Sequence, residues 1–177
     1  MRDAISESFL EAQHREVLAL AQASDGLTVV PVPTASGPPT DYFARFRARS
    51  LIQRAGTIEP VEEFAVAVHF PADYLRRVLN PAQVVMLLWP ANLYHPNVRF
   101  PAICTGHLPP GTGLVEILWQ VYEILTYQRV TPREDDALNP EACAWARANL
   151  HRFPIDPRPL KRRSLDLEMQ PLPGGEP

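Results

Sequence analysis

The chain has 177 residues, of which 46% are hydrophobic, a length that suits one domain with its own core and leaves little room for a second. Its net charge of −3, with no basic stripe, argues against a nucleic-acid-binding protein. No segment reaches the roughly 18 apolar residues needed to span a bilayer, and the charged N-terminus lacks the apolar block of a secretion signal. We therefore expect a cytoplasmic protein without nucleic-acid or membrane partners.

The first half of the chain alternates between helix and strand signals. Residues 3–23 carry apolar side chains at helical spacing and end at Ser24-Asp25-Gly26, which predicts an amphipathic helix. Residues 27–31 form a short extended piece and 31–40 a loop. Residues 42–53 and 62–70 alternate as half-exposed strands do. Residues 84–89 are continuously apolar, which predicts a strand covered on both faces.

The second half begins with a proline-rich, charge-poor stretch at 90–113, which we interpret as a long ordered loop of the kind that carries function. Residues 114–127 predict an apolar helix and 140–150 a second, with Asn139 as N-cap and Pro140 at the first position. The order predicts an α+β fold, an antiparallel meander sheet flanked by an N-terminal helix and C-terminal helices. We assign residues 1–153 to the domain and 154–177 to a Pro-rich tail.

The two cysteines each need their own explanation, because a structural disulfide is not expected in a reducing compartment. Cys143 lies in the last predicted helix and fits a buried packing role. Cys104 lies in the long loop with Asn97, whose amide could support an oxyanion when the thiolate attacks a carbonyl. Spacing alone leaves open a buried filler, a thiol protease pairing Cys104 with His95 or His107, and a metal site with His107 and Cys143.

Four motifs in this order resemble the ubiquitin-conjugating (UBC) enzyme family. HFPADYL at 69–75 is similar to the family's FPxDYP signature, and YHPNV at 94–98 resembles the HPN motif that precedes the catalytic cysteine. AIC at 102–104 matches the residues at that cysteine, and DDALNPEA at 135–142 resembles the family's DDPLNPEA. The resemblance covers about residues 27–150 and implies a UBC-like fold.

The resemblance assigns a role to each matching residue. Cys104 would accept the C-terminal glycine of a ubiquitin-like protein from an activating enzyme and pass it to a lysine of a target protein. Asn97 would stabilise the oxyanion or hold the loop, and His95 would support the loop by hydrogen bonding rather than act as a base. Asp136 would orient the incoming lysine. No metal or organic cofactor is implied.

Other residues would shape the surroundings of Cys104. Tyr94, Asp135 and His107 would line the substrate groove. The N-terminal helix is where activating enzymes dock in the family, which makes Arg2, His14 and Arg15 candidate contacts, although a solvated helix face explains them equally well.

The sequence also departs from the family pattern. The spacer between Asn97 and Cys104, VRFPAI, is one residue shorter than usual, and the acid that follows the cysteine is replaced in CTGHL at 104–108. The ligase-binding WSP loop becomes PPGTG at 109–113, and the loop before Asp135 is longer. With these changes the chain resembles bacterial members of the family, which are encoded beside a ubiquitin-like protein, often in antiphage operons. Two other functions compete with conjugation: a catalytically silent UBC-like or RWD-like binding module, and a thiol hydrolase.

Overall fold

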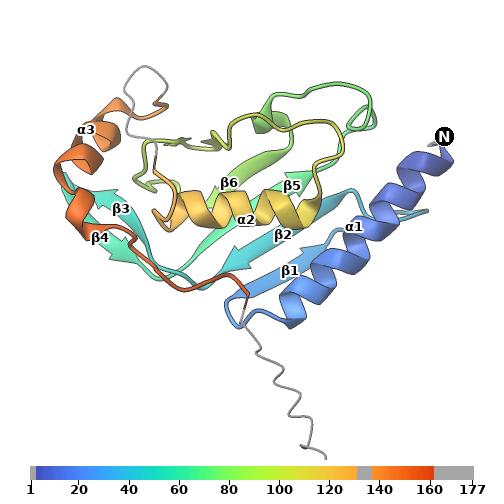
Figure 1. The fold of residues 1–177 in the computed structure, drawn as a ribbon, viewed down its shortest axis with the longest axis horizontal. Helices are drawn as coiled ribbons and strands as arrows, with labels where there is room; N and C mark the ends of the chain where they lie inside the picture. Colours follow the sequence, from blue (N-terminus) through green and yellow to red (C-terminus); the bar gives the residue numbers. More distant parts are fainter. Residues whose placement is uncertain (1–2, 131–136, 162–177) are drawn as a thin grey trace, which may run out of the picture.

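The computed structural model describes residues 3–130 and 137–161 and combines helices with antiparallel sheet (Figure 1). The helices are α1 (Ala4–Gln22), α2 (Leu114–Leu125) and α3 (Pro140–Ala148), with short 3-10 turns at Pro81–Gln83 and Leu150–Arg152. The strands are β1 (Leu27–Pro31), β2 (Asp41–Phe46), β3 (Ser50–Arg54), β4 (Thr57–Val61), β5 (Phe64–His69), β6 (Val85–Trp89), β7 (Val98–Arg99) and β8 (Ala102–Ile103). The predicted α+β class is confirmed.

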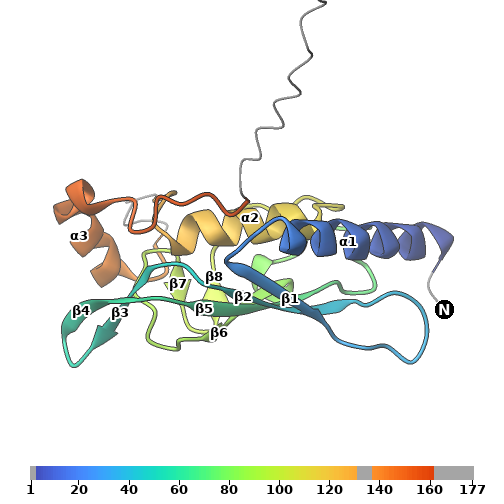
Figure 2. The same ribbon diagram turned by 90° about the horizontal axis from the view of Figure 1, so that it is seen from below.

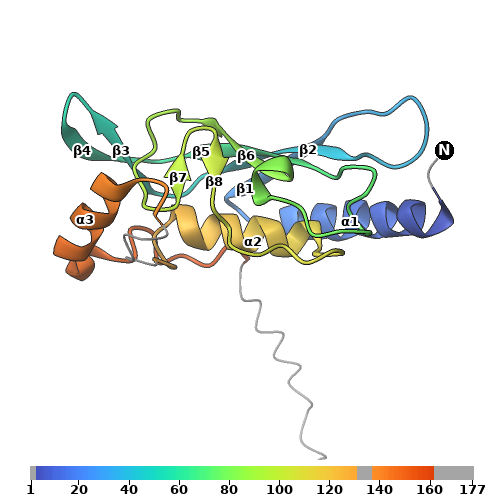
Figure 3. The same ribbon diagram turned by 90° about the horizontal axis from the view of Figure 1, so that it is seen from above.

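Six strands form one antiparallel sheet in the order β1-β2-β5-β6-β8-β7, and β3 and β4 form a separate hairpin. Helices α1 and α2 lie on the same face of the larger sheet, as the two turned views show (Figures 2 and 3). Asp3 caps α1 by accepting a hydrogen bond from the Ser6 amide at 2.8 Å. Within the described ranges, no helix combines the length and apolar character that a membrane crossing requires.

Two clusters of buried side chains stabilise this arrangement. The larger fills the space between the sheet and the helices α1 and α2, and includes Val17, Phe46, Val66, Ile117 and Val121. The smaller lies where β3 meets α3 and consists of Leu51, Tyr94, Tyr127, Ala142 and Ala146. Tyr94, the first residue of the YHPNV segment, belongs to this smaller cluster.

The prediction of one strand over residues 42–53 is wrong. The chain forms β2 and β3 in two different sheets, although burial alternates across the break. The amide of Arg47 donates to the Gly26 carbonyl at 2.7 Å, and the amide of Arg49 donates to the Asp156 carboxylate at 2.8 Å. Because a residue 107 positions away in the chain takes this amide, local alternation could not reveal the break.

Strand β4 was not predicted at all. It pairs with β3 across a turn at Ala55-Gly56, where both residues have positive φ, 49° and 81°. The hairpin twist favours such a turn. Pro60 lies within β4, and proline is tolerated there because β4 has no second strand partner among the described residues.

The prediction that residues 84–89 are covered on both faces is also wrong. Val85 and Leu87 point into the core, whereas Met86, Leu88 and Trp89 are 40%, 39% and 46% exposed. No helix lies on that face of the sheet in the described part of the chain (Figure 2). A continuous apolar run therefore marks one buried face and one open apolar face here.

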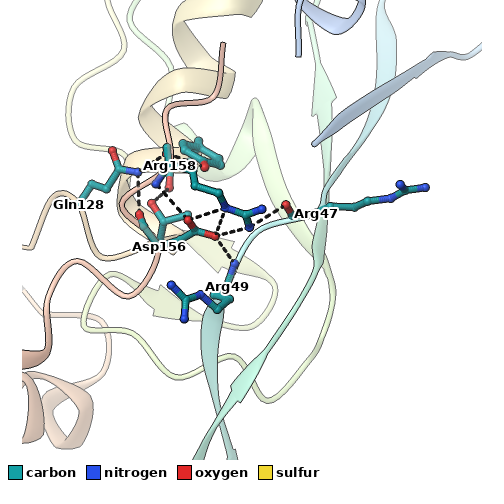
Figure 4. A network of polar contacts seen from close by, with 7 residues as sticks. Arg47, Arg49, Gln128, Asp156 and Arg158 are labelled. Atoms are coloured by element: carbon teal, nitrogen blue, oxygen red, sulfur yellow. Dashed lines mark hydrogen bonds and ion pairs between the residues drawn. The ribbon is translucent and has the colours of Figure 1, made fainter. Parts of the chain in front are cut away.

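Residues 154–161, which the sequence groups with the tail, lie against the domain. Asp156 is fully buried and accepts hydrogen bonds from the Arg49 amide, the Arg158 amide and the Arg158 guanidinium (Figure 4). Gln128 donates to the carbonyls of Asp156 and Arg158, both at 2.9 Å. Leu160 then enters the larger core. Residues 154–161 therefore connect the bend between β2 and β3 to the residues that follow α2.

Replacing Asp156 with alanine should lower the free energy of unfolding by about 2–3 kcal/mol, because it removes several hydrogen bonds from a buried charged acceptor. Burial acts to raise the pKa of the Asp156 carboxyl, but the hydrogen bonds from Arg158 and the Arg49 amide lower it on balance. The ionised form is therefore favoured on folding, and its stabilisation is present above the ordinary carboxyl pKa of about 4 and lost as the pH falls below it.

Urea unfolding at pH 7 and pH 3 measures both effects. Asp73→Ala is the matched control, since Asp73 is a partly exposed carboxylate, with its side chain 40% accessible, paired with Arg77. It should change stability by less than about 1 kcal/mol. Equal losses for the two variants at pH 7 would contradict the role given to Asp156.

Candidate active site around Cys104

Cys104 directly follows β8, and a short hairpin with β7 brings it beside Asn97. Val98 is paired with Ile103 and Arg99 with Ala102. The Cys104 amide donates to the Asn97 carbonyl at 2.8 Å, and the Asn97 side-chain amide donates to the Cys104 carbonyl at 3.1 Å. The spacer that is one residue short therefore still leaves residues 97 and 104 as direct neighbours.

The two cysteines have opposite environments. Cys104 is partly exposed, whereas Cys143 on α3 is fully buried. A thiol must reach solvent to act on a macromolecular substrate, so Cys104 is the only one of the two that fits the chemistry. The described residues contain no group of three or more His, Cys, Asp or Glu side chains that could hold a metal ion.

His95 lies beneath the loop and is fully buried. Its Nδ1 accepts a hydrogen bond from the Asn97 amide at 3.0 Å, and its ring lies 4.3 Å from the Tyr127 ring. In the described part of the protein its Nε2 has no hydrogen-bond partner. Desolvation lowers the pKa of His95 to about 3, so the ring is neutral at physiological pH. This geometry matches a loop support and disfavours a base that shuttles protons from Cys104.

The neutral, buried His95 should make stability depend on pH. The unfolded chain binds a proton on this ring below its ordinary pKa of about 6.5, while the folded protein does not. The free energy of unfolding should therefore fall as the pH drops from about 6.5 towards 4. His95→Asn should weaken this dependence, because asparagine Oδ1 takes the place of Nδ1 and can accept the Asn97 bond without titrating. Urea titrations between pH 4 and 7 check this; identical slopes for the two proteins would contradict it.

Asn97 uses its side chain to hold the Cys104 carbonyl, so of its two predicted roles the structure displays the loop-holding one. If Cys104 carries an acyl group, as the family resemblance implies, Asn97→Ala should slow its loading and its discharge together, by about three- to tenfold, because one hydrogen bond that positions the thiol is lost. The matched control is Asn149→Ala, which removes a similar amide bond to the Trp145 carbonyl, at 2.8 Å.

Single-turnover gels measure the two steps separately. A loss of 100-fold or more in discharge with unchanged loading would mean that the Asn97 amide turns towards the oxyanion, and would contradict the positioning role.

Tyr94 is buried rather than open to a groove over Cys104. Its amide donates to the Leu51 carbonyl at 2.8 Å, its carbonyl accepts from the Tyr127 hydroxyl, and its ring is 6.0 Å from Trp145. Burial raises the pKa of its phenol. Its position connects the loop to the smaller core cluster, and one side of it lines a cavity of about 310 Å³.

The remaining predicted residues divide between exposed and undescribed positions. His107 is exposed, one residue after Gly106, which has a φ of 86°. The structure shows no hydrogen bond between His107 and Cys104 in the described part. Asp135 and Asp136 lie outside the described residues. Of the predicted activating-enzyme contacts, Arg15 is exposed on α1 and His14 is half-buried with its ring 6.1 Å from that of Tyr42, while Arg2 is not described.

Two contacts of this site were missed by the sequence. Asn139 was predicted as an N-cap, and its side-chain oxygen accepts from the Ala142 amide at 3.0 Å. Its backbone N–H also donates to the Pro96 carbonyl at 3.0 Å. Tyr127 lies under the loop, between the His95 ring and Phe153, 4.6 Å away. Its φ of 58° in a non-glycine residue is unusual, but no feature of the sequence signals it.

The chain matches no protein-family model, and no curated protein matches it significantly. The function must therefore be argued from the residues and their geometry.

Proposed function

We propose that this protein is a conjugating enzyme that carries a ubiquitin-like protein as a thioester on Cys104 and transfers it to an amine. The single observation that carries the proposal is the pair of hydrogen bonds, at 2.8 and 3.1 Å, between Asn97 and the partly exposed Cys104. A neutral, buried His95 lies beneath them. Motif segments that are separate in the sequence converge there, since Asn139 also bonds to Pro96. We propose in addition that the fold of this chain is UBC-like.

The chemistry has two steps. In the first, the Cys104 Sγ attacks the thioester carbonyl of the donor, and the donor's thiolate leaves. In the second, a lysine amine attacks the same carbonyl, the Cys104 thiolate leaves, and an isopeptide forms after the amine loses its proton. The first step is close to thermoneutral, since one thioester replaces another.

Positioning can supply most of the rate enhancement that these steps need. Holding two reactants in place contributes up to roughly 7–11 kcal/mol. The histidine beneath the loop is enclosed and burial lowers its pKa to about 3, so it is too weak a base to take the proton of the amine. We therefore expect discharge to speed up with pH as more of the free amine is deprotonated.

A discharge assay tests the proposal. A ubiquitin-like protein with a C-terminal mercaptoethanesulfonate thioester is used to load the protein, which removes the need for an activating enzyme. Free lysine is then added, and the products are separated by mass. Isopeptide formation that outpaces hydrolysis supports an acyl transferase. Rapid hydrolysis that lysine does not divert would instead indicate a thiol hydrolase, and no loading at all would favour a silent binding module.

A further inference from the structure

The larger sheet has one face that points away from α1 and α2, which we call the open face (Figure 2). Exposed apolar side chains from three strands lie on it, with the small side chains of Ala65 and Ala67 on β5 between them. The exposed apolar residues are Val30 of β1, Phe43 of β2, and Met86 and Leu88 of β6. A contiguous apolar patch on the surface of a folded domain marks a site of association. None of the roles proposed so far uses this face.

The strand register joins these side chains into one row across the sheet. Val30 is paired with Phe43, and Phe43 with Ala67. Ala67 is paired with Met86, and Met86 with Ala102 of β8. We call these five residues the apolar row. Because neighbouring strands lie about 4.8 Å apart, the row is about 19 Å long.

Charged side chains lie on opposite sides of the apolar row, on β2. Asp41 and Arg45 are two residues before and two residues after Phe43, so all three side chains point to the open face. Each charge has a neighbour on β5 or just before it: the Asp41 carboxylate lies 2.7 Å from His69 Nδ1, and the Arg45 guanidinium lies 3.0 Å from the Glu63 carboxylate. A carboxylate and a guanidinium are therefore placed at matched distances from the same aromatic ring.

This pattern is complementary to itself. Two sheets pack face to face when their strands are nearly aligned, about 10 Å apart. If a second copy is turned by 180° about an axis along the apolar row, each strand lies over the same strand of the other copy with its direction reversed. Phe43 then meets Phe43 of the second copy, and Asp41 of each copy meets Arg45 of the other.

We propose that the open face binds a second copy of this chain, in a two-fold dimer centred on Phe43 with ion pairs between Asp41 and Arg45 of opposite copies. The inference does not depend on the proposed function. Because the axis runs along the apolar row, the β7–β8 hairpins of both copies lie at the same end of the dimer.

The size of the open face indicates how strong this dimer is. At the usual strand spacing and rise, the apolar row and its flanking positions cover about 24 by 20 Å, or roughly 500 Å² of each copy. A total of about 1,000 Å² is typical of weak and reversible interfaces. We therefore expect a dissociation constant on the order of 100 µM.

Sedimentation equilibrium between about 10 µM and 1 mM tests the proposal, and the average mass should rise from one chain towards two. Phe43→Arg should weaken the dimer at least about tenfold, because it buries two unpaired like charges at the axis. Met86→Arg, on another strand, should do the same, and circular dichroism checks that both variants are folded. Leu150→Arg is the matched control, since Leu150 is 56% exposed and Phe43 is 48% exposed, but Leu150 lies in the turn after α3.

The control should self-associate as the wild type does. A wild-type protein that stays monomeric at about 1 mM would overturn the proposal, whatever else covers the open face. So would a dimer that Phe43→Arg and Met86→Arg leave intact, or one that Leu150→Arg weakens equally.

A charge exchange tests the two-fold arrangement itself. Asp41→Arg and Arg45→Asp should each weaken self-association at least about fivefold, because like charges then face each other twice. An equimolar mixture of the two variants should recover the wild-type extent of dimer, since both ion pairs form again between unlike copies. A mixture that stays as dissociated as its components would overturn the proposed pairing.

Amide chemical shifts of the isotope-labelled protein distinguish a second copy from another occupant. The signals of residues 43 and 86 should move as the protein alone is concentrated, even if it never forms a thioester. Signals that are independent of protein concentration, but move when a ubiquitin-like protein is added, would assign the open face to that partner and overturn the dimer.

Discussion

Iodoacetamide should label Cys104 of the native protein at least about 100 times faster than Cys143. Cys104 is partly exposed after β8, whereas Cys143 is fully buried on α3 and reacts only when that region opens. Such openings are rare in a stable domain. Peptide mapping by mass spectrometry after timed labelling gives both rates in one sample.

The control for this measurement is the protein in concentrated urea, where both thiols should react at similar rates. A native protein in which the two cysteines react equally, or in which Cys143 reacts first, would contradict the environments described here. The candidate active site would then lose its nucleophile.

Tyr127→Ala should lower the free energy of unfolding by about 3–5 kcal/mol, the range for removing a buried aromatic side chain. The Tyr127 ring is 1% exposed and packs between His95 and Phe153, and its hydroxyl donates to the Tyr94 carbonyl. Loss of the ring leaves a cavity directly beneath the segment 94–97. We expect Cys104 labelling to remain fast while loading slows, because the thiol stays exposed but the loop loses its support.

Urea unfolding measures the stability change, and Tyr127→Phe separates its two parts. Phenylalanine keeps the ring and removes the hydroxyl, so it should cost only about 1 kcal/mol. A loss below 1 kcal/mol in Tyr127→Ala itself would show that this ring does not support the loop.

Local patterns were sufficient for the elements that are stabilised by nearby residues. The helices α1 and α3 are capped by Asp3 and Asn139, whose side chains accept bonds from amides three residues ahead, and the cap at Asn139 was predicted from the sequence. The alternation at β5 was likewise sufficient, since one face of that strand is buried and the other is only half-covered. In these segments the propensity, the period and the burial agree.

The errors have long-range causes. The break between β2 and β3 depends on the carboxylate of Asp156, which no window of sequence around Arg49 contains. One face of β6 is exposed because no helix of the described chain covers it, and an apolar run in the sequence does not indicate whether a helix will do so. A proline generally disfavours a strand, and Pro60 is accommodated in β4 because this strand pairs only with β3 in the described part of the chain.

The site shows the same division. The resemblance named Cys104, Asn97 and His95, and the structure places them together through backbone and side-chain bonds. It could not name Tyr127, because the role of that residue comes from packing rather than from a motif. Asp135 and Asp136 stay predictions, since they lie outside the described residues.

The most direct measurement is a non-reducing gel of the protein after incubation with a ubiquitin-like thioester, run beside Cys104→Ala and Cys143→Ala. The protein can carry an acyl group as a thioester only if an accessible cysteine sulfur accepts it. We predict a thiol-sensitive adduct in the wild type and in Cys143→Ala, and none in Cys104→Ala. An adduct that persists without the sulfur of residue 104 would contradict the account.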